Sequence, residues 1–440
     1  MRDYIVAIDL GTSHITGIVG EKKADGMFSV IACETEDSSS CIRRGNIYNV
    51  DNTEKHVASL VRKLERSLNG GYIDRVYVGV GGQSLRTVNH VESKKIKDGE
   101  TVSADDIQAL REQCGRHKFG LQDVLEIAPA TYYVDGRLEK NPVGIPCEKL
   151  EAHYKVVIGR NSIRRDIVKS IHDRCGKTIA GIVVSPLALA DAMLSSEEKE
   201  LGCALVDFGA GVTSVTVYKN GDLLYSAVIP LGGNLITHDI TSLQLTETVS
   251  EKLKREYGSA IPGNESDDEK IKVDLESANR EISLNDLNVV VEARAKEIVE
   301  NVYARISEVT DVKALSQGIV LAGCASELKK LPELIRERFK IKARPSAIRG
   351  GLISGGDEML GNPLYMMAVS LMLRGVEPCV SHPATPEPVA PDGGEDVVEP
   401  VHTEPDPVPV PDTSHTKRIK KGKNDWRDLI VDIFKGQNEQ

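Results

Sequence analysis

Apolar residues along the first 375 positions follow two spacings. Runs such as VYVGVGG at 76–82 and CALVDFG at 203–209 are continuous enough for buried strands, whereas TEKHVASLVRKLERSL at 53–68 repeats its apolar positions every three or four residues, as an amphipathic helix does. Strands and helices of this kind alternate, which predicts an α/β fold. Because 440 residues exceed the length at which one hydrophobic core stops growing, we expect two or more domains.

The pattern changes at residue 376. Residues 376–416 hold ten of the 19 prolines and nine acidic residues, but no lysine or arginine. Such a segment cannot bury enough apolar surface to offset its ordering entropy, so we expect a disordered linker that can reach on the order of 100 Å when extended. The alternative is a surface tail without function, but a segment with helical periodicity follows it.

Residues 417–440 combine basic charge with an amphipathic helix between Asn424 and Gly436. One arc of about 140° holds its large apolar side chains. These are Trp426, Leu429, Ile430, Ile433 and Phe434. Residues 417–435 carry seven bases and three acids, which suits an anionic membrane surface. Docking onto the chain's own folded domain or into a partner's groove are the alternatives.

Membrane attachment through a single tail is expected to be marginal. Each large apolar side chain gains roughly 1.5–3 kcal/mol on burial, whereas ordering the helix costs on the order of 1 kcal/mol or more per residue. Binding should therefore be reversible and gain strongly when many copies sit on one polymer.

Charge and cysteine content narrow the class of protein. The formal net charge is -11 and the basic cluster lies in the tail, which argues against general nucleic-acid binding. Eight cysteines without a C-x-x-C pair indicate reduced thiols. The N-terminal MRDYIVAIDLGTSH reads as a strand instead of a signal peptide, and no run of apolar residues is long enough to span a bilayer. We therefore expect a cytosolic protein.

Two segments of the chain repeat one hairpin pattern. When VAIDLGTSHITGIVG at 6–20 is aligned without gaps to ALVDFGAGVTSVTVYKNG at 204–221, Asp9 meets Asp207 and Thr16 meets Ser214. In each segment an apolar strand delivers an aspartate to a turn of small residues, whose backbone N–H groups can approach an anion closely. One such turn is common, but two suggest a phosphate grip, with both aspartates holding Mg²⁺ through water. The turn residues are Gly11, Thr12, Ser13, Gly209, Ala210, Gly211 and Val212.

Three further segments fall in the order expected of a nucleotide site. Gly232 and Gly233 form a turn, and Glu251 and Lys254 lie at i, i+3 on one helical face, where they suit a ribose or adenine as well as a solvated ion pair. An apolar strand then ends at Gly323, followed by Cys324 and Ala325, where backbone can approach a base. Each segment alone is unspecific. Together they form the five-part pattern of the actin, Hsp70 and sugar kinase superfamily.

Within that superfamily the chain resembles the FtsA family of bacterial cell-division proteins. The resemblance rests on VYVGVGGQSLRTVNH, YYVDGRLEKNPVGIPCEKLEAHYKVV, SPLALADAMLSSEEKELGCALVDFGAG and NPLYMMAVSLMLRG, and on the terminal helix. It implies an actin-like two-domain fold with a duplicated ribonuclease-H-like core and an inserted subdomain, which FtsA shares with the pilus protein PilM. The implied divisions are 1–80 with 166–190 (subdomain 1A), 81–165 (1C, inserted), 191–235 with 308–375 (2A), 236–307 (2B), 376–416 (linker) and 417–440 (tail).

Departures from the superfamily pattern bear on catalysis. Superfamily ATPases commonly have Glu or Gln before the proline of E-P-L-A, whereas this chain has Ser185, whose hydroxyl is a poor base. The adenosine loop reads Gly-Cys-Ala, and Ala210 and Val212 replace Gly and Thr in the second phosphate loop. We therefore predict ATP binding with Mg²⁺, slow hydrolysis at most, and no catalytic residue. An active ATPase or phosphotransferase, or a PilM-like pilus assembly scaffold, are the alternatives.

The resemblance also implies partners. FtsA proteins hold the C-terminal peptide of the tubulin homologue FtsZ at the membrane, polymerise there at the division septum, and recruit later division proteins. Arg280 and Arg294 match family arginines in subdomain 2B, where guanidinium groups would suit an acidic peptide. The alternative is that both are solvated helix charges.

Overall fold

The N-terminal part of the chain builds a five-stranded sheet in the order β13-β7-β1-β2-β3. The computed structural model describes residues 3–97, 99–263, 269–275, 278–355 and 361–382. Strand β1 pairs antiparallel with β2 and parallel with β7. The strands are β1 (Asp3–Leu10), β2 (His14–Lys22), β3 (Phe28–Asp37), β7 (Arg75–Val80) and β13 (Thr178–Val184).

A second sheet repeats this topology in the order β16-β15-β14-β19-β20. Its first three strands are antiparallel, and β14 pairs parallel with β19 as β1 does with β7. The strands are β14 (Cys203–Phe208), β15 (Thr213–Lys219), β16 (Asp222–Ile229), β19 (Gly318–Ala322) and β20 (Ala343–Pro345). The two sheets therefore share the same strand order and the same strand directions. This confirms the predicted duplicated α/β core.

The two halves agree at single-residue register. In the first hairpin Asp9 stands opposite Thr16, and in the second Asp207 stands opposite Ser214. The two pairs occupy equivalent places, because the gapless alignment matches Asp9 with Asp207 and Thr16 with Ser214. Each aspartate is the last residue but one of its strand, so each carboxylate lies where the turn begins.

Helices cover both sheets because their apolar faces match the buried strands. Helix α1 packs on β2 and β3 through buried residues such as Val57, Leu60 and Leu64, and α11 packs on β1. The helices of the first half are α1 (Val50–Glu65), α3 (Asn161–Ile167), the π-helix η1 (Val168–Arg174), α4 (Ser185–Met193) and α11 (Pro363–Met372). The other short strands here are β4 (Ile42–Arg43), β5 (Asn46–Ile47), β6 (Tyr72–Ile73) and β21 (Val380–Ser381).

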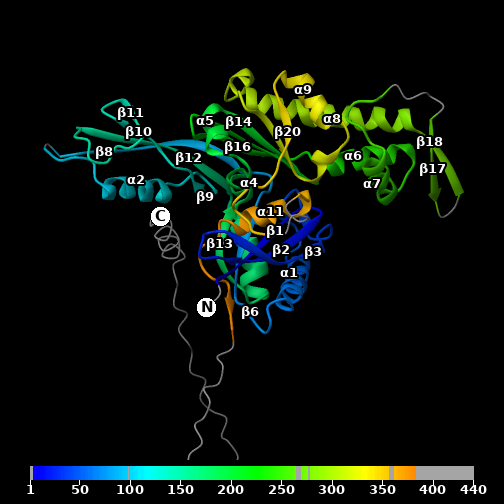
Figure 1. Ribbon diagram of the computed structural model, residues 1–440, viewed down its shortest axis with the longest axis horizontal. Helices are drawn as coiled ribbons and strands as arrows, with labels where there is room; N and C mark the ends of the chain where they lie inside the picture. Colours follow the sequence, from blue (N-terminus) through cyan, green and yellow to red (C-terminus); the bar gives the residue numbers. More distant parts are fainter. Residues whose placement is uncertain (1–2, 98, 264–268, 276–277, 356–360, 383–440) are drawn as a thin grey trace, which may run out of the picture. The chain divides into compact units, whose positions relative to one another are not determined.

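Helix α8 is the longest of the second half and shares a buried cluster with the second sheet. Figure 1 shows the β17–β18 hairpin at the end of this half, beyond α6 and α7. The elements are α5 (Ser196–Leu201), α6 (Gly233–Ile240), η2 (Thr241–Leu243), α7 (Glu247–Glu256), β17 (Lys270–Leu275), β18 (Ala278–Ser283), α8 (Leu284–Ser307), η3 (Val312–Ala314), η4 (Cys324–Glu327) and α9 (Leu331–Phe339).

An inserted subdomain extends the second sheet beyond β16. Its strand β8 pairs with β16 at Arg86 and Ala227, and Val228 N–H donates to the Leu85 carbonyl over 3.1 Å. Helix α2 packs on β8 and lies below the strands of this subdomain in Figure 1, sharing a separate small core with them. The elements are β8 (Arg86–Lys95), α2 (Ala104–Arg116), β9 (Gln122–Ile127), β10 (Thr131–Val134), β11 (Arg137–Glu139) and β12 (Lys149–Arg160).

The structure corrects the predicted start of the linker. Residues 376–382 belong to the folded unit: Cys379 is fully buried, and β21 pairs antiparallel with β6 at Val380 and Ile73. The Tyr77 hydroxyl accepts hydrogen bonds from the backbone N–H groups of Val376 and Glu377. Composition averaged over a long proline-rich window cannot detect a two-residue edge strand, which explains the error. The rest of the predicted linker and the tail lie outside the described residues.

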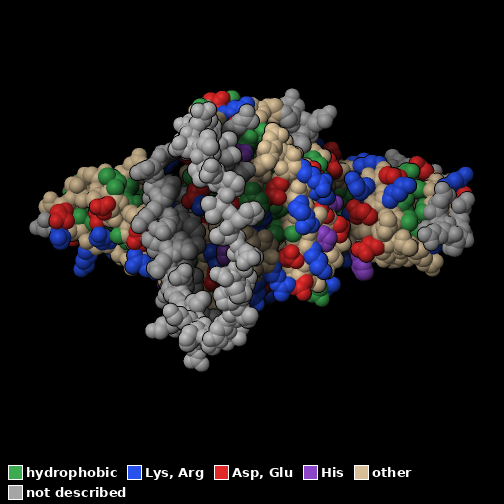
Figure 2. Space-filling model, turned by 90° about the horizontal axis from the view of Figure 1, so that it is seen from below, with side chains coloured by type: hydrophobic (Ala, Val, Ile, Leu, Met, Phe, Trp, Pro, Cys, Tyr) green, Lys and Arg blue, Asp and Glu red, His purple; other side chains and the backbone are tan. Residues whose placement is uncertain are grey.

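The surface carries charges of both signs. Figure 2 shows basic and acidic side chains interspersed over the visible face of the described residues. Across the residues described, no helix combines the length and the apolar character that crossing a bilayer requires.

Candidate functional site

The turns of the two hairpins touch each other. A Cβ added to Gly211 would lie 2.5 Å from Thr12 Oγ1 and 2.6 Å from its Cγ2, so the second turn meets the first face to face. Residues almost 200 positions apart in the chain thus come into contact because the two duplicated sheets present the same end of their hairpins to each other. This contact brings together the two halves of the predicted phosphate grip.

The two aspartates lie close enough to interact. Burial raises the pKa of Asp9 to about 7, and the negative charge of Asp207 adds to that rise. Burial likewise raises the pKa of Asp207 to about 6. Two partly buried carboxylates whose charged forms are disfavoured by burial form a site that a divalent cation would stabilise. Carboxylate oxygens are also ligands that Mg²⁺ accepts, so these residues fit the ion.

The first turn is held by residues that the sequence motif does not contain. The Ser38 hydroxyl donates to the Gly11 carbonyl over 2.7 Å, and Ser38 N–H donates to the Ser13 carbonyl over 3.2 Å. Gly45 N–H donates to Thr12 Oγ1 over 3.0 Å. Gly45 has a φ of 70°, a conformation that favours glycine, so the glycine at this position is the trace that the contact leaves in the sequence.

The second turn is held by helix α6. Gly233 N–H donates to the Gly209 carbonyl over 3.0 Å, and Asn234 N–H donates to the Ala210 carbonyl over 2.8 Å. A Cβ at Gly232 would lie 2.5 Å from the Ala210 carbonyl oxygen, so the backbone approach requires glycine there. The predicted glycine pair therefore begins a helix that supports the second phosphate turn.

Glu251 and Lys254 lie against the same helix. The Lys254 ammonium donates to the Gly233 carbonyl at 3.2 Å, to Thr237 Oγ1 at 2.8 Å and to Glu251 Oε2 at 2.6 Å. An ammonium group has three donors, and here all three have protein acceptors. The side chain of Lys254 is 12% exposed, so the pair is more than a solvated surface contact. A ribose would have to replace one of these acceptors to bond Lys254.

The strand end at Gly323 adjoins the second aspartate. Gly323 has a φ of 82°, and an added Cβ would collide with the Asp207 carboxylate. Cys324 begins the short helix η4, and the Ala325 side chain lies 3.0 Å from the Cβ position of Gly233. All five predicted segments are thereby joined by direct contacts.

Ser185 is not placed as an exposed base. It is the first residue of α4, is 2% exposed, and its hydroxyl is buried without a hydrogen-bond partner among the described residues. The hydroxyl lies 2.8 Å from the Cβ position of Gly79, on the neighbouring strand. A hydroxyl enclosed in this way is poorly suited to orient an attacking water.

The two predicted peptide-binding arginines contact one segment. Arg294 on α8 makes a bidentate ion pair with Asp239 on α6, with N–O distances of 2.6 and 3.2 Å, and also pairs with Glu297. Arg280 on β18 donates to the Gln244 carbonyl over 3.1 Å. Both guanidinium groups therefore lie along residues 239–244. Neither is an unattached surface charge.

A cavity of about 500 Å³ lies beside the first hairpin. Its wall includes Leu10, Gly45 and three arginines, Arg43, Arg44 and Arg160, but none of the predicted residues of the second hairpin. It is thus a separate feature from the paired turns. The predicted membrane residues Trp426, Leu429, Ile430, Ile433 and Phe434 lie outside the described residues.

Comparison with known proteins identifies the family. A family model described as cell division protein FtsA matches residues 204–370, and one described as the SHS2 domain inserted in FtsA matches residues 82–158. A cell division protein FtsA of Porphyromonas gingivalis is 31% identical over 389 residues, covering 88% of this chain and 81% of the relative. The chain belongs to the FtsA family.

Other relatives and a solved structure agree with this assignment. The FtsA of Neisseria meningitidis is 30% identical over 376 residues, covering 84% of this chain and 89% of the relative. A chain of the PilM-PilN type IV pilus biogenesis complex superposes with a TM-score of 0.59 at 16% identity, covering 85% of this chain and 99% of that one. The last similarity shows the actin-like fold alone. FtsA membership assigns the protein to cell division, and the SHS2 match makes the subdomain with β8–β12 the FtsA insertion.

Proposed function

We propose that this FtsA-family protein binds ATP with Mg²⁺ between its two hairpins, polymerises on the cytoplasmic membrane at the division septum, tethers FtsZ filaments there and recruits later division proteins. The observation that carries the proposal is the contact of Thr12 with Gly211 beside the Asp9 and Asp207 pair. Turns that meet in this way can hold one ligand from both halves of the fold, so nucleotide can link the halves.

The roles of the predicted residues follow from their contacts. Backbone N–H groups of Gly11 to Ser13 and of Gly209 to Val212 would bond the phosphates. Asp9 and Asp207 would hold the ion through water. Gly323, Cys324 and Ala325 would face the base, while Lys254 with Glu251 fixes the helix that supports the second turn.

Nucleotide would act mainly as an assembly ligand. No carboxylate stands at position 185, and the serine there is enclosed, which favours slow hydrolysis. Turnover by the purified protein should stay well below the roughly 1–100 s⁻¹ of kinases. A rate within that range would support the alternative function, an active ATPase. The family membership favours cell division over the pilus-scaffold alternative.

The peptide site is proposed along residues 239–244, with Arg280 and Arg294 as donors. Arg294→Gln should weaken capture of an FtsZ C-terminal peptide by roughly tenfold to a hundredfold, because a charged hydrogen bond of roughly 1.5–3 kcal/mol is lost. Asp239→Asn is the matched variant, since it removes the charge of one acidic partner while the guanidinium and its pair with Glu297 remain. We expect Asp239→Asn to keep or strengthen capture in a fluorescence anisotropy assay. Equal weakening by both substitutions would mean that the ion pair is only structural.

The membrane role rests on the tail, and co-sedimentation tests it. The full chain and a chain ending at Thr416 should be spun with vesicles containing anionic lipid, each with and without ATP. We expect the full chain to pellet, more strongly with ATP because assembly multiplies weak tails, and the shortened chain to stay in solution. Equal pelleting of both chains would refute the anchor.

A further inference from the structure

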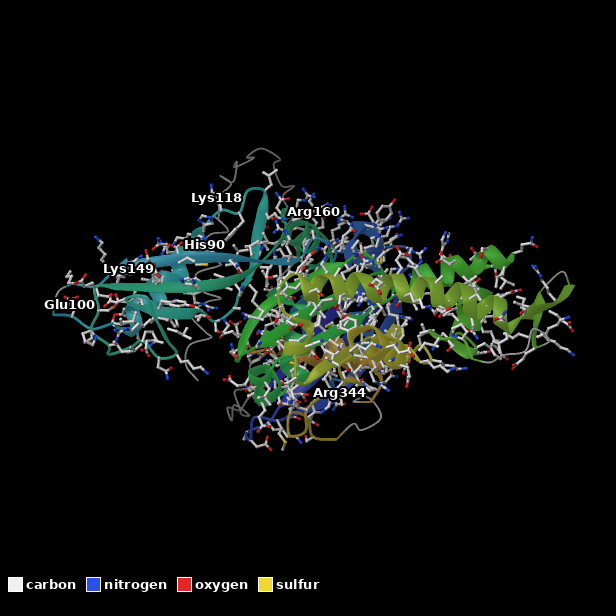
Figure 3. The ribbon with its side chains drawn as sticks, turned by 90° about the horizontal axis from the view of Figure 1, so that it is seen from above. His90, Glu100, Lys118, Lys149, Arg160 and Arg344 are labelled. Atoms are coloured by element: carbon white, nitrogen blue, oxygen red, sulfur yellow. The ribbon has the colours of Figure 1, made fainter. Side chains whose placement is uncertain are left out.

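Two histidines and a glutamate meet in the inserted subdomain, far from the paired hairpins. His90 and Glu92 lie on β8, and His117 stands where the chain leaves α2. One imidazole nitrogen from each histidine and a carboxylate oxygen of Glu92 lie within 4.8 Å of one another. Figure 3 shows His90 on its strand within this subdomain.

The fold explains why these three residues converge. Successive side chains of a strand point to opposite faces, so His90 and Glu92 share the face of Lys94, which pairs with Asp106 of α2 over 2.6 Å. That face is therefore covered by α2. The C-terminal end of the helix then brings His117 against His90, with ring centroids 4.2 Å apart.

The pair on β8 is largely withdrawn from solvent. The side chains of His90 and Glu92 are 15% and 11% exposed, and His90 Nε2 lies 2.7 Å from Glu92 Oε1. Burying a carboxylate is costly unless it is paired or bound to a cation. Tyr154, the cross-strand neighbour of His90, is 2% exposed and its hydroxyl has no hydrogen-bond partner among the described residues. A buried hydroxyl of this kind indicates a missing polar partner such as water.

The donor set selects the class of ion. Two imidazole nitrogens and one carboxylate form a ligand set that Zn²⁺ accepts, at about 2.0–2.2 Å from each atom, with a fourth position open to water. Ligand atoms of a tetrahedral ion are then about 3.4 Å apart. The 2.7 Å between His90 and Glu92 would have to open by less than 1 Å, and the exposed His117 ring is free to adjust.

We propose that His90, Glu92 and His117 form a zinc site that fastens the end of α2 to strand β8. The bound ion replaces the hydrogen bond between His90 and Glu92 and balances the buried carboxylate. The fourth position of the ion stays open to water. The site stabilises the inserted subdomain independently of nucleotide, so it can be tested apart from the function proposed above.

The experiment is a metal titration of the full chain. Protein freed of metal with a chelator is titrated with Zn²⁺ by calorimetry and with Co²⁺ by absorption, under reducing conditions. Eight cysteines could also bind metal. Co²⁺ on nitrogen and oxygen ligands gives visible bands without the near-ultraviolet charge-transfer band that thiolates add, so the spectrum identifies the ligands.

His117→Ala is the decisive variant, because the exposed ring can be removed without disturbing the core. His153→Ala is the matched control: this histidine stands on the neighbouring strand β12 opposite Val91, whose side chain points to the other face. We expect His117→Ala and His90→Ala to weaken the nitrogen-and-oxygen site by about tenfold or more, and His153→Ala to bind as the wild type does.

Melting temperature gives a second readout. Zn²⁺ should raise it in the wild type and in His153→Ala but not in His117→Ala, while the three metal-free proteins melt alike. Unchanged binding in His117→Ala, or an equal loss in His153→Ala, would overturn the site. A Co²⁺ spectrum dominated by thiolate ligands in the wild type would overturn it as well.

Discussion

The two hairpins share strand register and a partly buried aspartate, but their turns are held in different ways. The first turn is held by two side-chain hydroxyls, those of Ser38 and Thr12, together with one backbone hydrogen bond from Ser38 N–H. The second turn is fixed by backbone, through N–H groups at the start of α6. The duplicated hairpins thus both have an aspartate at the end of the first strand, whereas the residues that hydrogen-bond to each turn differ. Variants should therefore affect the two turns unequally.

The largest effect is expected at the contact between the turns. Gly211→Ala places a Cβ 2.5 Å from Thr12 Oγ1, and relieving such a clash costs about 1–3 kcal/mol, or roughly fivefold to a hundredfold in ATP affinity. Because the clash is with a side chain, Thr12→Gly should restore most of the loss in the double variant. Gly232→Ala cannot be rescued in this way, since it meets backbone. Binding of a fluorescent ATP analogue is measured for the wild type, Gly211→Ala, the double variant and Gly232→Ala. If Thr12→Gly did not rescue Gly211→Ala, the contact between the two turns would be contradicted.

The next effect is expected from the aspartates. Asp9→Asn removes one of two carboxylates beside the proposed ion, so Mg²⁺-dependent ATP affinity should fall by about tenfold or more. Affinity measured in chelator should not fall, because a negative charge is removed from beside the phosphates. Asp207→Asn should behave likewise. A variant that loses affinity equally with and without Mg²⁺ would contradict a role in holding the ion.

The same carboxylates predict a pH dependence of the free protein. Since folding raises the pKa of Asp9 to about 7 and that of Asp207 to about 6 from an ordinary 3.8, the folded state binds their protons more tightly. Their contribution to stability is complete below about pH 4 and is lost as pH rises through 6 and 7. Melting temperatures in chelator should therefore decline less over this range in Asp9→Asn than in the wild type. Equal slopes would rule out the coupled pair.

The smallest effect is expected from the hydroxyl of the first turn. Thr12→Ala leaves Gly45 N–H without its acceptor, at a cost of about 1 kcal/mol and a fall of about 1–2 °C in melting temperature. Ala210→Ser is the matched change in the second turn, where backbone holds the loop, and should stay within about 0.5 kcal/mol of the wild type. Equal effects would mean that the two turns are supported alike.

The sequence predicted the parts of this fold that repeat. Strand ends carrying Asp9 and Asp207 could be aligned because a turn that approaches an anion permits few residue types. The supports at Ser38 and Gly45 could not be predicted, because they follow from tertiary contacts that no local pattern records. For the same reason the ion pair of Arg294 with Asp239 could not be predicted from the sequence, because the two residues are 55 positions apart. The edge strand at Val380 was not predicted, because the proline-rich composition around it indicated a linker.

The central claim is that both hairpins bind one nucleotide, and a crystal structure of the chain with a non-hydrolysable ATP analogue and Mg²⁺ tests it most directly. We predict phosphates within hydrogen-bonding distance of the backbone at Gly11 to Ser13 and also at Gly209 to Val212, with the ion on the side of Asp9 and Asp207. A nucleotide seated instead in the cavity lined by Arg43, Arg44 and Arg160, touching one hairpin alone, would contradict the claim.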